Sequence, residues 1–406
     1  MERILFENAS LLDINHRSKA GYSVLVENGC IIAIEAGKIE ANSDKIINVK
    51  GKTLMPGLID AHVHLGIPVM NFAAMVDYPD SYFAIHAAEM AEVMLKQGFT
   101  TVRDAAGVDY GLVKTIENGL LKGPRIFFAH SLITKTGGHG DTRHRHTPMA
   151  TCACHFNRDA ILVADGIAAV RKATREILRR GATQIKIATS GGVITEHNSI
   201  HAPAFSADEI RAIVEEATDA ETYVMAHAHG YYGIRRAVEC GVRTIEHCSF
   251  LTDELAELMV KHGTYMSPTI FIAQELVVNK SLPPRIREKA EVALAAMLTS
   301  IQLAKKHGVK VGFGSDVFGK PIPRHAEEFL IRAKYEDPYE VIIAATATNA
   351  EMMQQQDKLG VIKKGAYADL IIVDGDPVKD ISLLADVAGK PIKLVMKHGK
   401  VYKNDL

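Results

Sequence analysis

Two short segments each place two histidines on one face of an expected strand. Successive side chains of a β-strand point to opposite faces, so residues i and i+2 share a face. In LIDAHVHLG, His62 and His64 therefore lie on one face with Asp60, and in YVMAHAHG, His227 shares a face with His229. Two imidazoles on one face can reach a single cation. We interpret His62, His64 and the deeper His227 as metal ligands, and we expect His229 at the rim of the site or in support of the ligands.

Two later segments end in the same kinds of side chain. In RTIEHCSF, His247 is expected on the same face as Ile245, and in VGFGSD, Asp316 ends the face that holds Gly314. A single buried histidine is more often a hydrogen-bonded core residue than a ligand. Several histidines and an aspartate at one end of one fold instead favour a metal site, and this ligand set suits zinc or a similar divalent ion.

Lys186 lies in the middle of TQIKIATSGGV, where the isoleucines on either side indicate a buried strand. The alternation of side chains points Lys186 toward the same interior as the histidines. Burial beside cations lowers the pKa of a lysine. The neutral amine can react with carbon dioxide to give a carbamate whose two oxygens bridge two metals. The alternative is a lysine of the core that pairs with Asp104 or Asp60.

The elements that would position these residues alternate between helices and short β-rich runs. Basic residues before a glycine mark helix ends, and a buried run follows each of them. Eight such runs lie between about residues 58 and 316: LIDAHVH, TTVRDAA, RIFFAHS, QIKIATS, YVMAHAH, RTIEHCS, YMSPTIF and VGFGSD. Eight β/α units predict a distorted (β/α)8 barrel of the triosephosphate-isomerase type over residues 58–357. An open doubly wound sheet is the alternative.

The two ends of the chain have a different texture, with short strands and turns and no convincing helices. We predict that residues 1–57 and 358–406 pair into one small composite β-sandwich domain.

One loop of the predicted barrel is unusually long. About 30 residues separate RIFFAHS from the next helix, and loops of that length are usually functional or disordered. Within this loop CACH, residues 152–155, is expected to be loop sequence and not half of a zinc site.

The composition excludes several classes of partner. Lys plus Arg number 47 against 48 for Asp plus Glu, a net charge of −1, which gives no reason to expect nucleic acid or a membrane surface as a partner. No apolar run is long enough to span a bilayer. The charged start predicts no secretion signal, and five cysteines fit a reducing compartment, so we expect a cytoplasmic protein.

The ligand candidates and their order along the chain resemble those of the metal-dependent amidohydrolase superfamily. They are His62, His64, Lys186, His227, His247 and Asp316. LMPGLIDAHVHLG is similar to its entry motif and GVIKKGAYADLIIVDGDP to its closing segment. GFTTVRDAAG, TGGHGD, QIKIATSGGV, VMAHAHG and RTIEHCSF look most like the binuclear zinc, prolidase-like branch (Xaa-Pro and Xaa-Arg dipeptidases, imidazolonepropionase-like proteins). The resemblance implies hydrolysis of the amide bond in small dipeptides or N-acyl amino acids. It also leaves open a homo-oligomer, because barrels of this family often assemble.

The resemblance also implies a role for each ligand. A pair of zinc ions is expected, the more buried one held by His62, His64 and Asp316. The other ion is expected at His227 and His247, with N6-carboxylated Lys186 bridging the two. Asp316 would take a proton from a metal-activated hydroxide and pass it to the leaving amine.

Substrate contacts are expected from loop residues. His139 in GGHGD resembles a histidine that binds or polarises the substrate. Tyr231 is a candidate donor to a substrate carboxylate, and Arg324 and His325 are candidates to receive one, as are Arg143 and Arg145. Asp104 is expected to support the ligands.

Two other functions compete with this one. One is an amidohydrolase that acts on a cyclic or non-peptide amide, like imidazolonepropionase, or a deaminase. Lys186 counts against the mononuclear members of these types, which generally lack a strand lysine at this position, whereas cyclic-amide hydrolases with a carboxylated lysine stay an open alternative. The second is a catalytically silent scaffold, which would be expected to have lost ligands that this chain retains.

Overall fold

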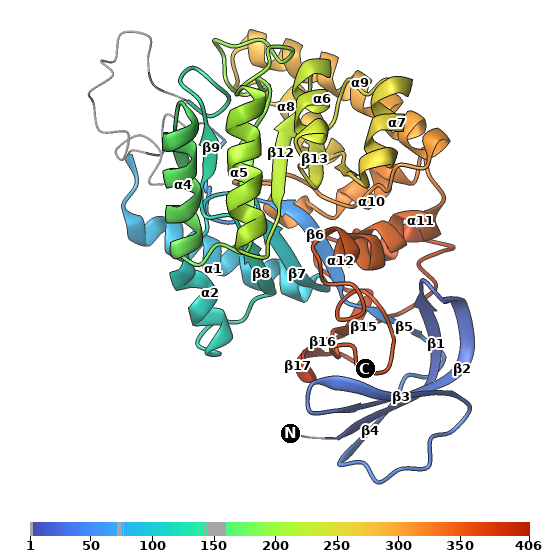
Figure 1. The fold of residues 1–406 in the computed structure, drawn as a ribbon. Coiled ribbons are helices and arrows are strands. Elements are labelled where there is room, and N and C mark those ends of the chain that lie inside the picture. Colours follow the sequence, from blue (N-terminus) through green and yellow to red (C-terminus); the bar gives the residue numbers. More distant parts are fainter. Residues whose placement is uncertain (1–2, 71–74, 76, 142, 144–159) are drawn as a thin grey trace.

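The computed structural model describes residues 3–70, 75, 77–141, 143 and 160–406, so CACH and Arg145 lie outside the described residues. Its middle part is an α/β fold with strands inside and helices outside (Figure 1). The strands form two parallel sheets, and nearly all their residues are buried, as expected where helices cover a parallel sheet. The smaller sheet consists of β6 (Leu58–Val63), β7 (Phe99–Asp104) and β8 (Arg125–Phe128). The larger sheet runs in the order β10 (Ile161–Val163), β9 (Leu132–Thr134), β11 (Ile185–Ala188), β12 (Val224–Ala228), β13 (Thr244–His247) and β14 (Tyr265–Ser267).

The last predicted run, residues 311–316, is not a regular strand. Val311 forms an isolated bridge with Met266, and Val317, directly after the run, forms one with Val63. The amide of Gly312 donates to the Met266 carbonyl of β14, and the amide of Asp316 donates to the His62 carbonyl of β6. The segment and its flanking residues thus form several backbone hydrogen bonds with each sheet, for example Ala61 with Phe313, without forming a regular strand ladder, since its glycines weaken a regular strand. The closed barrel therefore stays a prediction. The segment that we predicted as one long loop contains two short strands, β9 and β10, which the sequence did not indicate.

Helices follow most of the parallel strands and cover their outer side (Figure 1). Glycine after basic residues ends α7 and α9, where Gly263 and Gly308 adopt the left-handed conformation with φ of 65° and 80°. None of the described helices is both long and apolar enough to cross a membrane. The helices are α1 (Asp80–Lys96), α2 (Tyr110–Glu117), α4 (Ile167–Arg179), α5 (Ala207–Asp219), α6 (Tyr231–Glu239), α7 (Asp253–His262), α8 (Ile270–Val278), α9 (Pro284–His307), α10 (Glu327–Arg332), α11 (Pro338–Ile343) and α12 (Asn349–Met352).

The two chain ends pair into one mixed sheet of eight strands, seen in blue and red beside each other in Figure 1. The C-terminal strand β15 pairs with β5 from the N-terminal end, which joins segments more than 300 residues apart. The order is β17 (Lys400–Asn404), β16 (Ile392–Lys397), β15 (Leu370–Val373), β5 (Thr53–Pro56), β1 (Ile4–Asp13), β2 (His16–Glu27) and β3 (Cys30–Ala36), with β4 (Lys45–Asn48) also on β1. The pairing of the ends was predicted; the sandwich and the domain boundaries stay predictions.

Side-chain alternation in this sheet attaches it to the α/β part. Met55 and Ile371 belong to the large apolar core that they share with the helices. Leu54 and Leu370, one residue before each of them, belong to the separate core of the β-rich part. The period of two therefore divides one sheet between two cores, which fixes its position relative to the strands of the site.

Candidate metal centre

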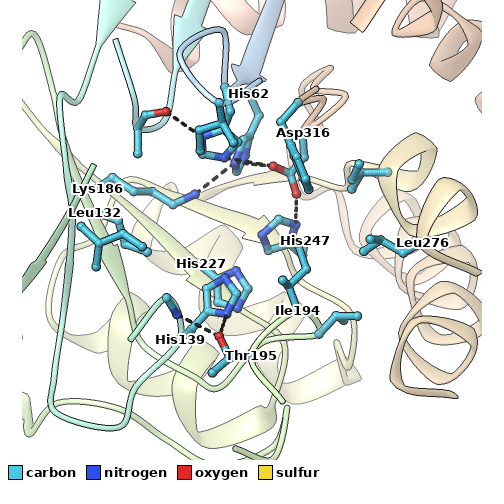
Figure 2. A pocket seen from close by; sticks show the side chains of 18 of the residues that line it. His62, Leu132, His139, Lys186, Ile194, Thr195, His227, His247, Leu276 and Asp316 are labelled. Carbon is cyan, nitrogen blue, oxygen red and sulfur yellow. Dashed lines mark hydrogen bonds and ion pairs between the residues drawn. The ribbon is translucent and has the colours of Figure 1, made fainter. Parts of the chain in front are cut away.

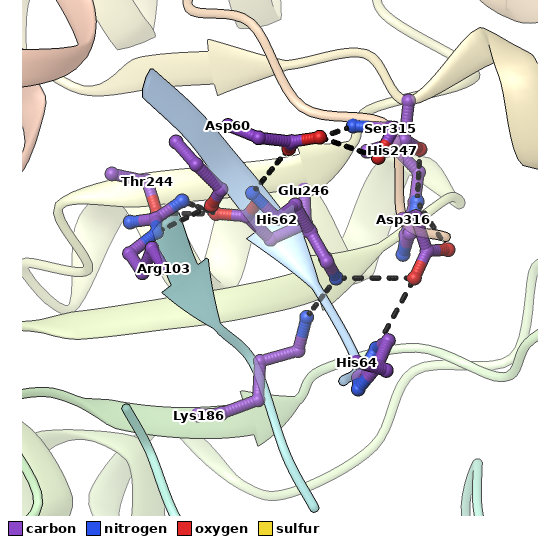
Figure 3. A network of polar contacts seen from close by, with 12 residues as sticks. Asp60, His62, His64, Arg103, Lys186, Thr244, Glu246, His247, Ser315 and Asp316 are labelled. Carbon is purple, nitrogen blue, oxygen red and sulfur yellow. Dashed lines mark hydrogen bonds and ion pairs between the residues drawn. The ribbon is translucent and has the colours of Figure 1, made fainter. Parts of the chain in front are cut away.

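His62 and His64 meet Asp316 at the carboxyl end of β6 (Figure 3). Oδ1 of Asp316 lies 3.3 Å from Nε2 of His62 and 3.1 Å from Nε2 of His64. The possible ligand atoms of the three residues all lie within 4.8 Å of one another. The two histidines predicted on one strand thus lie beside the predicted aspartate, which is about 250 residues later in the sequence. One cation could bind all three side chains.

His227, His229 and His247 form a second group of the same kind. Their possible ligand atoms also lie within 4.8 Å of one another, and the three residues are between 2% and 5% exposed. The ring of His229 stacks on that of His247 with a centroid distance of 5.0 Å. His229 is therefore a full member of the group, whereas the sequence placed it at the rim or in support.

His247 reaches this group because the strand ends at it. Ile245 packs into the core shared with the helices, while Glu246 contacts His62 in the interior. The predicted common face of Ile245 and His247 is therefore wrong, since a regular strand cannot point both Glu246 and His247 inward. The backbone φ of His247 is 70° and that of Cys248 is 48°, and this left-handed turn brings the imidazole into the cavity. Such strained conformations concentrate at functional sites.

Lys186 lies between the two groups (Figure 2). Its Nζ is 3.2 Å from Nε2 of His62, and the residue is 3% exposed. Burial lowers the pKa of Lys186 to about 8, although Glu246 and Asp316 act in the opposite direction.

The alternative partners of Lys186 are engaged elsewhere. Asp60 accepts hydrogen bonds from Ser315, and Asp104 accepts them from the amides of Leu65 and Val108. Neither carboxylate forms an ion pair with Lys186 among the described residues. The lysine of the core predicted as the alternative is thus not what the structure shows. Asp104 instead holds the loop after β6, which supports His64.

Hydrogen bonds at Nδ1 orient four of the imidazoles. For His62 and His64 the other ring nitrogen, Nε2, lies beside Asp316, as is usual for histidines that bind metals. The partners are Glu246 for His62 (2.6 Å), the Ala106 carbonyl for His64 (2.9 Å), Ser249 for His229 (2.7 Å) and Thr269 for His247 (2.7 Å).

The protonation of His227, His247 and Asp316 fits a divalent cation. Burial lowers the pKa of His227 and His247 well below the ordinary value, so both are neutral and have a free lone pair. Burial alone would raise the pKa of Asp316, but the nearby His62 and His64 outweigh it and the net pKa is lowered. Neutral imidazoles with an ionised carboxylate are a donor set for zinc or a related ion.

Glu246 and Arg103 form a buried ion pair behind His62, a feature that the sequence did not reveal (Figure 3). Both side chains are 0% exposed; Nη2 of Arg103 lies 3.0 Å from Oε1 of Glu246, and Nε of Arg103 donates to the Ala61 carbonyl. The other oxygen, Oε2, contacts His62. The available signal was a charged residue inside each of two apolar strands, TTVRDAA and RTIEHCS.

His139 lines the same cavity. Its ring stacks on His227 with a centroid distance of 4.0 Å, and Nδ1 lies 3.1 Å from Oγ1 of Thr195. Burial lowers its pKa to about 3. A Cβ on Gly192 would lie 2.0 Å from Nδ1 of His139, so only glycine leaves room for this ring.

The structure does not bring the other predicted substrate residues to the cavity. Tyr231 donates to Glu254 at 2.7 Å, and Arg324, 46% exposed at its side chain, pairs with Glu275 and Glu327. His325 is fully buried, with its ring nitrogens 3.0 Å from Asp60 and 3.2 Å from Gln97. Arg143 clamps Asp141. Partners distant in sequence engage three of these side chains, which sequence spacing cannot indicate.

The two groups line a cavity with a solvent-open mouth, and about 960 Å³ in and in front of it, open solvent included, is free of protein atoms. Apart from the polar groups above, its lining is mostly aliphatic (Figure 2). A concave apolar pocket with a few converging polar groups is the usual form of a small-molecule site.

Comparison with known proteins places the chain. The model of the amidohydrolase family matches residues 53–402. The chain belongs to the amidohydrolase family. A prolidase solved in complex with N-methylphosphonate-L-proline is 38% identical to this amidohydrolase, with a TM-score of 0.94 over 99% of this chain and 100% of the other. A Xaa-Pro dipeptidase with bound methionine is 31% identical, with a TM-score of 0.89 over 99% and 100%. Ochratoxinase of Aspergillus niger is 31% identical over 375 residues, 86% of this chain and 75% of the relative. The predicted resemblance to the prolidase-like branch is confirmed.

Proposed function

We propose that this amidohydrolase is a metal-dependent hydrolase that cleaves the amide bond of small dipeptides or N-acyl amino acids. The proposal is based on one observation: two groups of possible metal ligands and Lys186 line the same cavity. The similarity to a prolidase and to a Xaa-Pro dipeptidase supports the substrate class.

The proposed cofactor is a pair of zinc ions. His62, His64 and Asp316 would hold one, and His227 and His247 the other, with His229 beside them. Bound there, the ions would polarise the scissile carbonyl and lower the pKa of a water molecule toward neutrality. With a pKa of about 8, roughly a tenth of Lys186 is neutral at pH 7, which supports its carboxylation.

The protein's own residues would position the substrate and move the proton. Asp316 is ionised at neutral pH and faces the ligand groups, so it can accept a proton from water and give it to the leaving amine. His139 is neutral, with a pKa of about 3, and therefore cannot supply a proton as an acid near pH 7. Oγ1 of Thr195 accepts from the amide of Gly140, and in the tautomer that we propose its hydroxyl donates to Nδ1 of His139. Nε2–H of His139 then remains to donate to a substrate carbonyl.

The fold proposed around this site is a distorted (β/α)8 barrel over residues 58–357 with a β-sandwich domain from residues 1–57 and 358–406. The hydrogen bonds of residues 312–316 to β14 and to β6 support a barrel, because they connect the outer strands of the two parallel sheets. The catalytic end would then be the carboxyl end of the strands, where such barrels place their active sites.

Amino-acid release from a library of dipeptides and N-acyl amino acids tests the function. Zinc-loaded protein should hydrolyse a subset of the library, and Asp316→Asn should lower kcat by at least about 100-fold while its circular dichroism stays that of the wild type. A protein that binds two metals and releases nothing from any compound would contradict the proposal.

A further inference from the structure

Two separate apolar surfaces lie on opposite sides of the histidine groups. The first, which we call the α8 wall, consists of Ile272, Leu276 and Phe318 with their neighbours in one hydrophobic cluster. The second, the β9 wall, is formed by Leu132 with Ile161 in a different and smaller cluster. Figure 2 shows Leu132 and Leu276 on opposite sides, with His227 and His247 between them.

The α8 wall is part of a packed core and not a loose flap. Ile272, Leu276 and Phe318 are 2%, 4% and 2% exposed, and helix α9 packs against α8 behind them. The wall therefore keeps its shape when a ligand enters. The β9 wall offers less surface, with Leu132 at 7% exposed and Ile161 only partly buried.

The charges of the cavity all belong to its centre. Among the described residues, the acidic and basic side chains other than histidine that line the cavity are Lys186 and Asp316, and both face the ligand groups. A charged substrate group against either wall would lose its water without gaining a partner, whereas an apolar group would gain from burial.

We propose that the site takes amides with an apolar side chain or acyl group on each side of the scissile bond, the bulkier one against the α8 wall and the smaller one against the β9 wall, with the carboxylate of the amino acid directed away from both walls. This inference rests on the proposed function and adds the chemical class of the substrate. An amide bond that reaches the centre places its acyl and amine portions on the two sides, where the walls lie.

Four phosphonamidate analogues of N-acyl amino acids test the inference on the zinc-loaded wild-type protein. They combine a methylphosphonyl or phenylphosphonyl group with glycine or leucine, and calorimetry measures their Kd. Each apolar group should lower Kd by about 10- to 100-fold, the effect of burying one aromatic or leucine side chain. The compound with both groups should bind most tightly. Equal affinity of all four within about 3-fold would overturn the inference.

Matched variants assign the effect to the walls. Leu276→Gln should remove most of the gain from one of the two apolar groups. Leu132→Gln should remove the gain from the other group. Val278→Gln, on the same helix but 66% exposed, is the control and should change neither. Gains that persist in both wall variants would overturn the inference. Selective binding by a protein that hydrolyses no amide would support the apolar walls while contradicting the proposed function.

Discussion

Replacing Glu246 with glutamine changes a single charge behind the candidate metal centre. Oε1 of Glu246 accepts from Arg103 at 3.0 Å and Oε2 accepts from Nδ1 of His62 at 2.6 Å. As a metal ligand through Nε2, His62 must keep its proton on Nδ1, and the carboxylate enforces that tautomer. Glutamine has one acceptor oxygen, so it can satisfy either Arg103 or His62 but not both.

Two magnitudes follow from these contacts. Arg103 and Glu246 are both 0% exposed, and removal of one partner from a buried pair costs about 3–5 kcal/mol of stability. If the amide group of glutamine faces His62, it donates to Nδ1 and moves the ring proton to Nε2, where it blocks the metal. Loss of such an orienting partner weakens metal affinity by about 10- to 100-fold.

Urea unfolding of the metal-free protein and competition of the zinc-loaded protein with a chelator measure the two effects separately. Glu336→Gln is the matched control, because Glu336 forms a buried pair with Arg332 at 2.6 Å and contacts no residue of the centre. Glu336→Gln should lose stability to a similar extent and keep the zinc affinity of the wild type.

The proposed role of Glu246 is supported only if Glu246→Gln loses both stability and zinc affinity. If this variant binds zinc as tightly as Glu336→Gln does, Glu246 does not orient His62. If it loses less than about 1 kcal/mol of stability, the buried pair contributes no more than an exposed one would.

Four further results are expected. Lys186→Ala should lose most activity and regain part of it with added short-chain carboxylates; turnover equal to the wild type would exclude a bridging carbamate. His139→Ala should lower kcat/KM by about 10- to 100-fold for the loss of one positioned donor at unchanged metal content, and an unaltered value would return His139 to a structural role. Gly192→Ala should lower kcat/KM in the same way, because its Cβ would displace His139, which lies 2.0 Å from the Cβ position; full activity would show that the loop yields freely. Removal of metal should lower Tm in calorimetry, since zinc at 100 times its Kd stabilises the fold by about 2.7 kcal/mol, and an unchanged Tm after complete removal would contradict the centre.

Local alternation made much of this site readable from the sequence. The spacing of His62 and His64 and the inward position of Lys186 follow from the period of two of a buried strand, which depends only on neighbouring residues. The glycines after basic helix ends likewise marked the boundaries of α7 and α9, because the left-handed cap is a local preference. The alternation of helices and β-rich runs and the motifs of the family resemblance are likewise patterns of residues close together in sequence.

Non-local contacts decided the rest. His247 enters the cavity through a backbone with φ of 70°, which alternation does not anticipate and which the surrounding fold must hold in place. Arg324 and His325 have the right chemistry for a substrate carboxylate, but Glu275 and Asp60, distant in sequence, engage them first. Glu246 accepts a hydrogen bond from His62, which is 184 residues away in the sequence. A sequence fixes which groups a strand can offer to its two faces, whereas the partner that each group meets depends on how distant strands pack around a common interior.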